Sequence, residues 1–373
     1  MKGRRLTGGR VRKMEKAKAA VFEGAGKPFV LKEFPVVAAP AGMARLSLLA
    51  SGVCGTDVHI HKGRLAMPSN RIIGHEFIGT VEDISKEDSQ RSGIRKGDRA
   101  IVDIACPCGK CRLCRNGDDA NCVNMGVTND GNPDEAPYLH GGYARKSFAP
   151  VENLIKIPDG LDPVTVCVYA CVGSTIMHNI ALAKKAGWEP KADDTAVVQG
   201  LGPMGTFAAA YFASLGVKNV VAVTAAHDEQ RERAAKEIGV SRVLTLKDDI
   251  KGEIMKMTDG LGADFCLEAS GAPSAFPTGL DILRNRGVYM VPGQYSVSGG
   301  VSVSPEMITF KALHIIGSSQ YSISDVKSYL DFLIANPELC RIFRGFAKEY
   351  KLEDINTAIA DAEAGKNIKT VLV

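Results

Sequence analysis

Four cysteines lie within a fifteen-residue stretch of this chain and limit how that stretch can fold. The run CGKCRLCRNGDDANC spaces them as C-x2-C-x2-C-x7-C. Turns of two residues let neighbouring sulfurs converge on one point, as a tetrahedral Zn²⁺ site with Zn–S bonds of roughly 2.3 Å requires. Cysteines this close in sequence pair poorly as disulfides. We therefore predict a closed structural zinc site formed by Cys108, Cys111, Cys114 and Cys122.

Length, composition and charge favour a two-domain globular protein. The 373 residues suffice for two cores, and the charged share of 24% and apolar share of 45% are ordinary for a globular chain. The net charge of +4 is partly local, because residues 1–13 carry six basic side chains and no acid. The rest of the chain is close to neutral, which argues against a nucleic-acid partner or an anionic membrane surface.

The basic start of the chain is predicted to be a disordered leader over residues 1–15, or an over-extended start with Met14 as the true beginning. A signal peptide needs about seven to fifteen apolar residues, which this segment lacks, and no segment approaches the roughly 20 apolar residues of a membrane span. Ten cysteines without a secretory leader favour a reducing compartment. We expect a cytoplasmic protein with no membrane partner.

The pattern of apolar residues changes along the chain. From Lys18 to about Ala105, short apolar segments are broken by Gly and Pro, which predicts a β-rich module. From Thr195 onward, short buried strands alternate with helical segments, which is typical of a doubly wound parallel sheet. After about Ile315 the pattern returns to helices and short strands.

A glycine-rich turn follows the first strand of the alternating region. Gly200, Gly202 and Gly205 form G-x-G-x-x-G between a predicted strand and a predicted helix. The first glycine permits the tight turn, the second lets a pyrophosphate approach the backbone, and the third lets helix and strand pack closely. Free N–H groups at the helix N-terminus then bind the phosphates. This context favours a dinucleotide site over a generic glycine turn.

The sequence does not choose between NAD and NADP. The second strand ends at Thr224 and no acid follows before Asp228, so the carboxylate expected to bind a ribose 2′-hydroxyl is missing. A 2′-phosphate could fit, but Arg231 and Arg233 lie a helical turn further on. Asp228 could also reach back if the loop folds over. The prediction is therefore NAD(P).

Two further motifs, CGTDVHIH and GHEFIG, hold ligands suited to a second zinc. Cys54 and His75 are donors that zinc prefers, and Glu76 is an adjacent carboxylate. Cys171, in YACVGST, is the best candidate for a third ligand, which leaves a fourth position for water or substrate. A lone cysteine is usually part of a core, so the prediction depends on the conjunction of these residues.

These motifs, in this order and at these approximate distances, resemble the zinc-dependent medium-chain alcohol dehydrogenases over nearly the whole chain from about Lys16. The resemblance implies an α/β fold with a GroES-like β-barrel catalytic domain and a Rossmann doubly wound parallel-sheet domain. The implied boundaries are 16–172 for the catalytic domain, with its structural-zinc lobe at 106–122, then 173–315 for the Rossmann domain and 316–373 for a return to the catalytic domain.

The resemblance also assigns roles to individual residues. The implied ligands of the catalytic zinc are Cys54, His75 and Cys171, with Glu76 able to approach the metal during ligand exchange. The implied catalytic residues are Thr56, which takes the alcohol proton, His59, which passes it to solvent, Asp57, which holds the ligand histidine, and Glu76. The implied cofactor-binding residues are Gly200, Leu201, Gly202, Pro203, Met204, Gly205, Thr224, Arg231, Val291 and Gly293.

Several segments resemble the polyol, threonine and cyclic-alcohol branches of the family more than the ethanol-type branch. Glu268 would then lie near the nicotinamide, although it can equally be a packing acid. The run GGVSVSPEMITF resembles the edge strand through which members pair their sheets, which implies a homodimer or homotetramer. His140 can project into the pocket or be solvated, His61 receives no role, and Cys106 is a minor rival ligand in the lobe.

The predicted function is zinc-dependent hydride transfer between a secondary alcohol or polyol and NAD(P)⁺, by an oxidoreductase that acts on CH–OH groups and holds two zincs per subunit. One alternative is a zinc-free quinone or enoyl reductase, and the ligand set argues against it. The other alternative is a zinc-ribbon protein that binds nucleic acid or a protein partner. The near-neutral charge of the chain beyond residue 13 argues against this alternative. The substrate depends on segments such as Thr175–Asn179 and Gln294–Ser296, so primary alcohols, sugar alcohols, cyclitols and terpenoid alcohols all stay open.

Overall fold

The structure, a computed structural model, describes residues 14–294, 299–318 and 320–373. The predicted leader up to residue 13 and the pocket residues 295 and 296 lie outside these ranges. No helix in the described ranges is long and apolar enough to cross a membrane.

The strands are β1 (Lys16–Val21), β2 (Val30–Pro35), β3 (Met43–Val53), β4 (Glu76–Ile84), β5 (Arg99–Val102), β6 (Ala105–Cys106), β7 (Gly126–Val127), β8 (Lys146–Pro150), β9 (Leu154–Lys156), β10 (Thr195–Gln199), β11 (Asn219–Thr224), β12 (Arg242–Thr245), β13 (Ala263–Glu268), β14 (Leu283–Val291), β15 (His314–Gly317), β16 (Ala347–Tyr350) and β17 (Lys369–Leu372).

The helices are α1 (Gly55–His61), α2 (Lys86–Ser92), α3 (Arg112–Arg115), α4 (Pro163–Val168), α5 (Ala170–Lys185), α6 (Pro203–Ser214), α7 (Glu229–Glu237), α8 (Ile250–Met257), α9 (Ala275–Ile282), α10 (Glu306–Thr309), α11 (Ile323–Ala335), α12 (Pro337–Phe346) and α13 (Ile355–Glu363), with short 3-10 turns at Asp119–Asn121, Val151–Asn153 and Leu352–Asp354.

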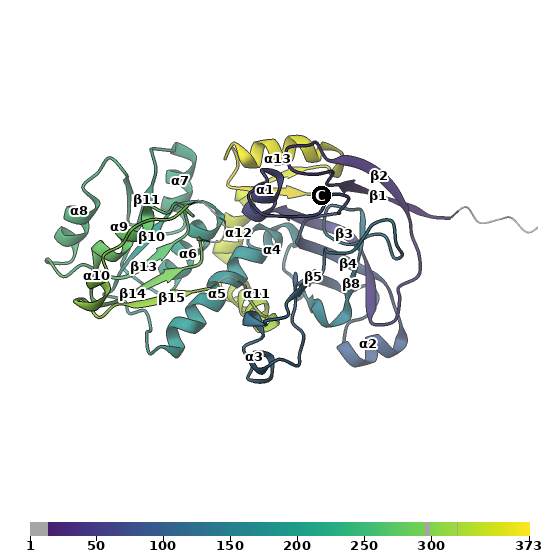
Figure 1. The fold of residues 1–373 in the computed structure, drawn as a ribbon, viewed down its shortest axis with the longest axis horizontal. Coiled ribbons are helices and arrows are strands. Elements are labelled where there is room, and N and C mark those ends of the chain that lie inside the picture. The colour runs from purple at the N-terminus through teal and green to yellow at the C-terminus, as the bar shows by residue number, and fades with distance from the viewer. Residues whose placement is uncertain (1–13, 295–298, 319) are drawn as a thin grey trace, which may run out of the picture.

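A six-stranded parallel sheet forms one half of the molecule, in the order β12-β11-β10-β13-β14-β15 (Figure 1). The chain builds outward from β10 to β12 on one side and then from β13 to β15 on the other. This reversal between β10 and β13 opens a crevice at the carboxyl ends of the two strands, which is where open parallel sheets bind ligands. Every residue of β10 is buried, as expected for a strand with helices on both faces.

A seven-stranded, largely antiparallel sheet forms the other half, in the order β16-β17-β3-β4-β5-β9 with β8 also paired to β3. The long strand β3 is its centre and pairs with β4, β8 and β17. Because β17 is the last strand of the chain, residues near the C-terminus lie beside Val53 and next to the motif that follows it. The α/β fold class predicted from sequence is confirmed.

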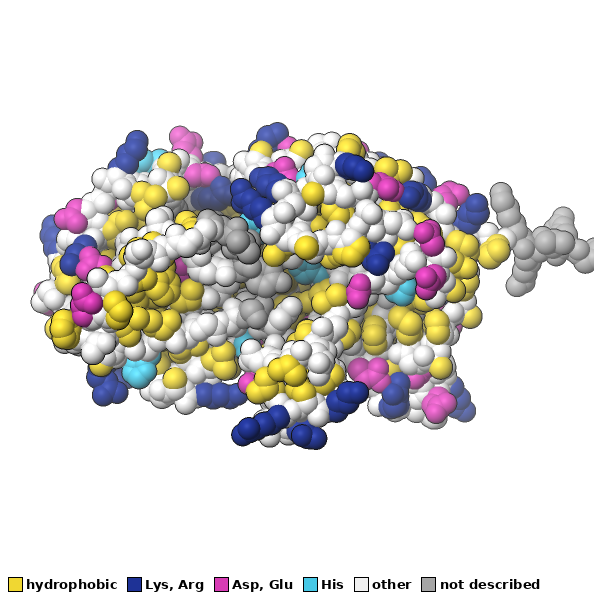
Figure 2. Space-filling model, in the orientation of Figure 1, with side chains coloured by type: hydrophobic (Ala, Val, Ile, Leu, Met, Phe, Trp, Pro, Cys, Tyr) yellow, Lys and Arg dark blue, Asp and Glu magenta, His cyan; other side chains and the backbone are white. Residues whose placement is uncertain are grey.

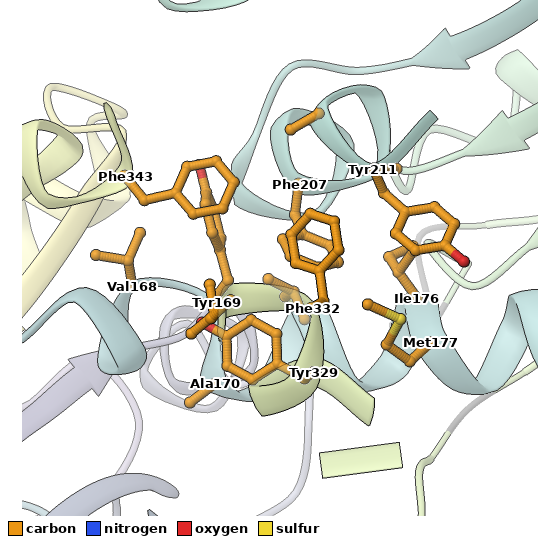
Figure 3. Packing of buried hydrophobic residues seen from close by; sticks show 14 of the residues in the cluster. Val168, Tyr169, Ala170, Ile176, Met177, Phe207, Tyr211, Tyr329, Phe332 and Phe343 are labelled. Carbon is orange, nitrogen blue, oxygen red and sulfur yellow. The ribbon is translucent and has the colours of Figure 1, made fainter. Parts of the chain in front are cut away.

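The two halves are joined by a shared apolar core built on helices α5, α6, α11 and α12 (Figure 3). Phe207 of α6 lies at its centre, with ring centroids 5.6 Å from Tyr329 and 5.3 Å from Phe332. Tyr169, between α4 and α5, packs edge-on against Phe343 at 4.7 Å. Buried aromatic pairs of this kind stabilise beyond their buried area by about 0.5–1.5 kcal/mol each. The core therefore holds the two sheets around one cleft.

Several local expectations from sequence differ from the structure. The β-rich segment contains two helices, α1 and α2, where only strands and turns are predicted. The described residues 299–310 form no strand but contain α10, and the edge of the parallel sheet is β15 instead. Serine- and glycine-rich alternation in that run resembles a strand, but no neighbouring strand pairs with it within the described chain. The domain boundaries expected at 172/173 and 315/316 stay predictions; their positions lie within α5 and β15.

Candidate metal centre and cofactor cleft

The paired strands β3 and β4 bring the first two candidate metal ligands together. Gly52 on β3 pairs with Glu76 on β4, so Cys54, at the start of α1, lies next to His75. Cys171, in the first turn of α5, completes the group. One ligand atom from each of Cys54, His75, Glu76 and Cys171 lies within 4.8 Å of the other three. The structure thus brings together the three predicted zinc ligands and the Glu76 carboxylate that is predicted to approach the metal.

Asp57 supports this cluster from behind. Its carboxylate is fully buried and accepts hydrogen bonds from the Cys54 amide at 2.9 Å and from the Tyr143 hydroxyl at 2.8 Å. The other oxygen lies 3.4 Å from Nδ1 of His75. Burial by itself lowers the pKa of His75, but the Asp57 carboxylate raises it well above its usual range. Pairing at Nδ1 fixes the ring and leaves Nε2 as the nitrogen available to a metal.

The two cysteines of the cluster influence each other directly. Their mutual hydrogen bond lowers the pKa of the Cys54 thiol well below its ordinary value and, with burial, raises that of Cys171. Metal binding requires thiolates, and this pair already favours one of them without a cation. The oxygen Oε1 of Glu76 is buried without a hydrogen-bond partner. Two sulfurs, an imidazole and an unpartnered carboxylate oxygen together fit a zinc ion.

A buried ion pair with Lys369 holds the other oxygen of Glu76. Lys369 is the first residue of β17, its side chain is 1% exposed, and its Nζ donates to Oε2 of Glu76. Burial raises the pKa of Glu76 to about 7, while Lys369 opposes that shift. Lys369 is not among the residues predicted from the sequence. The signal that could have found it is a lysine within the mostly apolar final segment, IKTVLV.

Thr56 and His59, both on α1, face the open side of the cluster. Both line the main cleft, and Oγ1 of Thr56 lies 3.7 Å from Sγ of Cys54. Burial lowers the pKa of His59, and Arg64 contributes in the same direction. A neutral imidazole is therefore available to accept a proton near neutral pH. His59 Nδ1 is buried without a partner among the described residues.

One cleft of about 450 Å³ joins the metal centre to the parallel sheet. On one side it is lined by Cys54, His75 and Cys171. On the other side it is lined by residues of the glycine turn and of the two turns that follow β13 and β14. A ligand bound at the crevice between β10 and β13 would therefore meet a substrate bound at the metal.

The glycine turn has the geometry of a phosphate-binding turn. Gly200 has a φ of +96°, which an L side chain rarely adopts, and Gly202 is the N-cap of α6. A Cβ on Gly205 would collide with the carbonyl oxygen of Gly200, so only glycine lets α6 pack this close to β10. Pro203 opens the helix, Met204 lines the cleft and Leu201 is buried beneath the turn. These features fit a dinucleotide pyrophosphate.

The residues after β11 are already engaged with one another. Thr224 donates its hydroxyl to the carbonyl of Ala226 at 3.0 Å. Arg231 donates to Asp228 at 2.7 Å, to the carbonyl of Leu201 at 3.2 Å and to the carbonyl of Gly365 at 3.1 Å. Arg231 thus braces the glycine turn and links it to the end of α13. Asp228 caps α7 through the same arginine and does not reach back toward Thr224.

Glu268 organises the turn that follows β13, in the wall of the cleft that faces the metal centre. Its Oε1 accepts hydrogen bonds from the backbone amides of Ser270 and Gly271 at 2.7 and 2.9 Å. A Cβ on Gly293 would meet Oε2 of Glu268, so the turn after β14 approaches this carboxylate closely. Gly293 lines the cleft, whereas Val291 does not. Glu268 acts on the shape of these turns and is not itself part of the cleft lining.

The cysteine lobe forms a second metal-ligating group. The sulfurs of Cys108, Cys111, Cys114 and Cys122 all lie within 4.8 Å of one another, and all four thiols are free. Backbone amides point at them, and hydrogen bonds from Lys110 and Cys111 lower the pKa of Cys108 to about 6. Amide donors aimed at sulfur stabilise thiolates, so the group fits a closed zinc site.

Cys106 stays outside this lobe cluster. Its thiol donates to the side-chain oxygen of Asn153 at 3.6 Å, and burial raises its pKa to about 11. His61 also has a structural contact, since its Nδ1 lies 2.6 Å from Glu363. His140 is partly buried, and burial lowers its pKa, but it does not line the cleft. Tyr321, which the sequence analysis did not single out, does line it.

We expect Cys111→Ser to lose the lobe zinc and lower thermal stability while leaving the chemistry at the cleft in place. Structural zinc binding contributes directly to folding free energy, so losing one of four thiolates weakens the whole lobe. Zinc content per chain and the melting temperature measure both effects. Cys106→Ser is the matched control, because Cys106 belongs to the same lobe but not to the cluster. Full zinc content and full stability in Cys111→Ser would contradict the assignment.

Comparison with known proteins identifies the family. Residues 40–159 match the alcohol dehydrogenase GroES-like domain, and residues 203–335 match the zinc-binding dehydrogenase family. The chain is 31% identical over 287 residues to L-threonine 3-dehydrogenase from Pyrococcus horikoshii, covering 74% of this chain and 75% of that protein. It is 28% identical over 347 residues to sorbitol dehydrogenase from Halalkalibacterium halodurans, covering 92% and 95%.

The same relationship holds in three dimensions. The crystal structure of an alcohol dehydrogenase from Thermotoga maritima matches with a TM-score of 0.84 at 27% identity, covering 96% of this chain and 99% of the other. The chain therefore belongs to the zinc-dependent medium-chain alcohol dehydrogenase family.

Proposed function

We propose that this protein is an alcohol dehydrogenase that transfers a hydride between a secondary alcohol or polyol and NAD(P)⁺, using one catalytic and one structural zinc. The observation that carries the proposal is the convergence of Cys54, His75, Glu76 and Cys171 at one end of a cleft whose other wall is a glycine-rich dinucleotide turn. Relatives named sorbitol dehydrogenase and L-threonine 3-dehydrogenase support the same reaction class.

Each residue of the proposed site has a defined task. A zinc ion bound there would act as a Lewis acid on the substrate oxygen, and NAD(P)⁺ would accept the hydride. Thr56 takes the hydroxyl proton of the substrate, and His59, which shares the cleft, passes it to solvent. Asp57 holds His75 in the tautomer that a metal needs. The three glycines and Pro203 position the pyrophosphate, while Thr224 and Arg231 shape the adenosine end.

The proposal is tested by zinc content per chain, before and after mild chelation, with NAD⁺ and NADP⁺ turnover assayed in parallel on a panel of secondary alcohols. Two zincs, of which one is removed easily together with activity, support both sites. A single zinc that resists chelation, with no alcohol turnover, would refute the catalytic site and favour the zinc-free quinone or enoyl reductase reading.

His59→Ala should change the pH dependence of alcohol oxidation. The lowered pKa of His59 keeps the imidazole neutral down to pH values below its usual 6.5, so the wild type retains a proton acceptor there. As pH falls through the folded pKa, the imidazole becomes protonated and the relay stops. The variant lacks the acceptor at every pH, and only hydroxide replaces it, so its loss is greatest at low pH, by about 10²-fold. A pH–rate profile that matches the wild type excludes His59 from the mechanism.

The same proposal includes the arrangement of the chain and its assembly. We propose a catalytic domain over 16–172 and 316–373 and a nucleotide-binding domain over 173–315, with α5 as their junction. The exposed edge strand β15, where Ile315 is 39% exposed, supports pairing of two copies into a homodimer or homotetramer. We also propose that the protein is cytoplasmic.

A nucleic-acid partner is not favoured. Charges of both signs are scattered over the visible face of the molecule (Figure 2). A retardation assay at increasing salt tests this, since binding through phosphates weakens steeply as salt rises.

A further inference from the structure

We propose that the cleft selects an apolar secondary alcohol, such as a cyclic or branched hydrocarbon alcohol, over a polyol or an amino-acid alcohol. This inference rests on the proposed dehydrogenase function and names the substrate class of the same site. It is carried by the side chains that line the cleft beyond the metal and the glycine turn.

The substrate end of the cleft is walled by apolar side chains from separate parts of the chain. These are Ile60, Leu65, Met67, Ile104, Val127 and Val172. They come from α1 and the segment after it, the segment after β5, the short strand β7 and the first turn of α5. Because apolar side chains from several segments surround the substrate, it meets polar protein groups from few directions.

The polar groups of the lining are few and mostly engaged. Thr175 donates its hydroxyl to the carbonyl of Cys171 at 3.0 Å, and Ser270 donates its hydroxyl to Glu268. Thr56 and His59 are assigned to the reacting proton. Among the described lining residues, the side-chain amides of Asn129 and Gln320 and the hydroxyl of Tyr321 are what remains for further substrate hydroxyls. A polyol has several further hydroxyls, and each one buried without a partner costs about 1–3 kcal/mol.

Charged groups in the lining are fewer still. Apart from the two histidines, Lys369 is the one charged side chain among the described residues that line the cleft, and it is paired with Glu76. The nearby carboxylates of Asp57, Glu76 and Glu268 are all buried and none lines the cleft. L-Threonine carries an ammonium and a carboxylate beside its hydroxyl. Both would be buried here without a partner of opposite charge, which is strongly unfavourable.

The first test compares one pair of substrates that differ in the number of hydroxyl groups and one series that differs in apolar chain length. Cyclohexanol and myo-inositol share one ring, and 2-butanol, 2-hexanol and 2-octanol share one reacting group. On the zinc-loaded protein with its preferred dinucleotide, kcat/KM for cyclohexanol should exceed that for myo-inositol by at least about 100-fold, the discrimination typical of one mismatched hydroxyl in an apolar pocket. Within the 2-alkanol series, kcat/KM should rise by about fourfold for each buried methylene.

A matched pair of variants tests whether the wall causes this selectivity. Leu65→Gln places an amide in the cleft, whereas Leu261→Gln makes the same change at a side chain that is 70% exposed and lies far from it. In Leu65→Gln, the ratio of kcat/KM for cyclohexanol to that for myo-inositol should fall by about tenfold. This corresponds to a loss of roughly 1.4 kcal/mol in the preference for the cyclohexanol transition state. In Leu261→Gln the ratio should stay at the wild-type value. Val127→Thr adds a hydroxyl at a half-exposed strand without changing side-chain shape, so it repeats the test if Leu65→Gln folds poorly.

Binding gives a second readout that does not require turnover. In the presence of the reduced dinucleotide, cyclohexanone should raise the melting temperature more than an inositol ketone at equal concentration, because bound ligand stabilises the folded state. Equal or greater turnover of myo-inositol, sorbitol or L-threonine would overturn the inference and leave the proposed dehydrogenase function intact. Absence of turnover on every alcohol with two zincs bound would refute the proposed function, and the inference would fall with it.

Discussion

Cys54→Ser should remove one of the two zincs and lower alcohol turnover by at least about 10³-fold, because Lewis-acid activation contributes several kcal/mol to such reactions. Cys54 is the thiol of the cluster whose pKa is lowered, so it is the thiolate that anchors the metal most readily. Serine is a favoured N-cap residue, so α1 should still begin correctly in the variant. The loss should therefore lie in metal binding and not in folding.

Zinc analysis, turnover and the melting temperature separate these effects. The variant should retain one zinc per chain, since the cysteine lobe is unaffected. Cys340→Ser is the matched control, because the Cys340 thiol donates to the carbonyl of Leu333 and a serine hydroxyl can do the same far from the cleft. If Cys54→Ser keeps two zincs and normal turnover, the catalytic metal lies elsewhere.

The parts of this site that sequence predicts are those whose geometry is local. The spacing of the lobe cysteines is set by two-residue turns, and the three glycines are set by one strand-to-helix turn. The structure of both motifs can be predicted from the local sequence, because the residues that must meet are close along the chain. The set of Cys54, His75 and Cys171 is longer-range. The donor types of these residues indicate a zinc site, and the resemblance of the whole motif order to one family supports their conjunction.

The parts that sequence missed depend on pairing between distant segments. Lys369 meets Glu76 across 293 positions, and Tyr143 meets Asp57 across 86. No periodicity links such residues, since they become neighbours only when β17 and the segment before β8 fold against the rest of the sheet. Arg231 illustrates the same limit: its spacing suggests a phosphate ligand, but its contact with Gly365 shows that it also braces two parts of the fold.

The substrate wall shows why composition alone did not decide substrate class. Leu65, Ile104 and Val127 are ordinary apolar residues in sequence, and each could equally belong to a core. They act on substrate choice only because the fold places them in one cleft together with the metal centre. The segment 299–310 is the converse case, since its serine- and glycine-rich alternation favours a strand and the described residues contain a helical turn instead.

Lys369→Met should destabilise the protein by about 3–5 kcal/mol, which is the cost of leaving one member of a buried ion pair without its partner. Glu76 is itself 1% exposed and has a second oxygen without a hydrogen-bond partner, so the fold offers it no replacement for the lysine. Methionine has a similar length, so the change removes the charge without opening a large cavity. The free energy of unfolding, measured by denaturant titration of the zinc-free protein, reports this loss, because a bound zinc would itself pair with the Glu76 carboxylate.

The double variant Lys369→Met/Glu76→Gln separates the charge effect from packing. Removing both charges should recover most of the stability lost in Lys369→Met, because a neutral amide tolerates burial better than an unpaired carboxylate. Zinc release to a chelator gives an independent readout. In Lys369→Met the freed carboxylate can approach the metal, so zinc exchange should differ from the wild type, whereas in the double variant that carboxylate is gone. If the single variant is as stable as the wild type, the Lys369–Glu76 pair does not support the site.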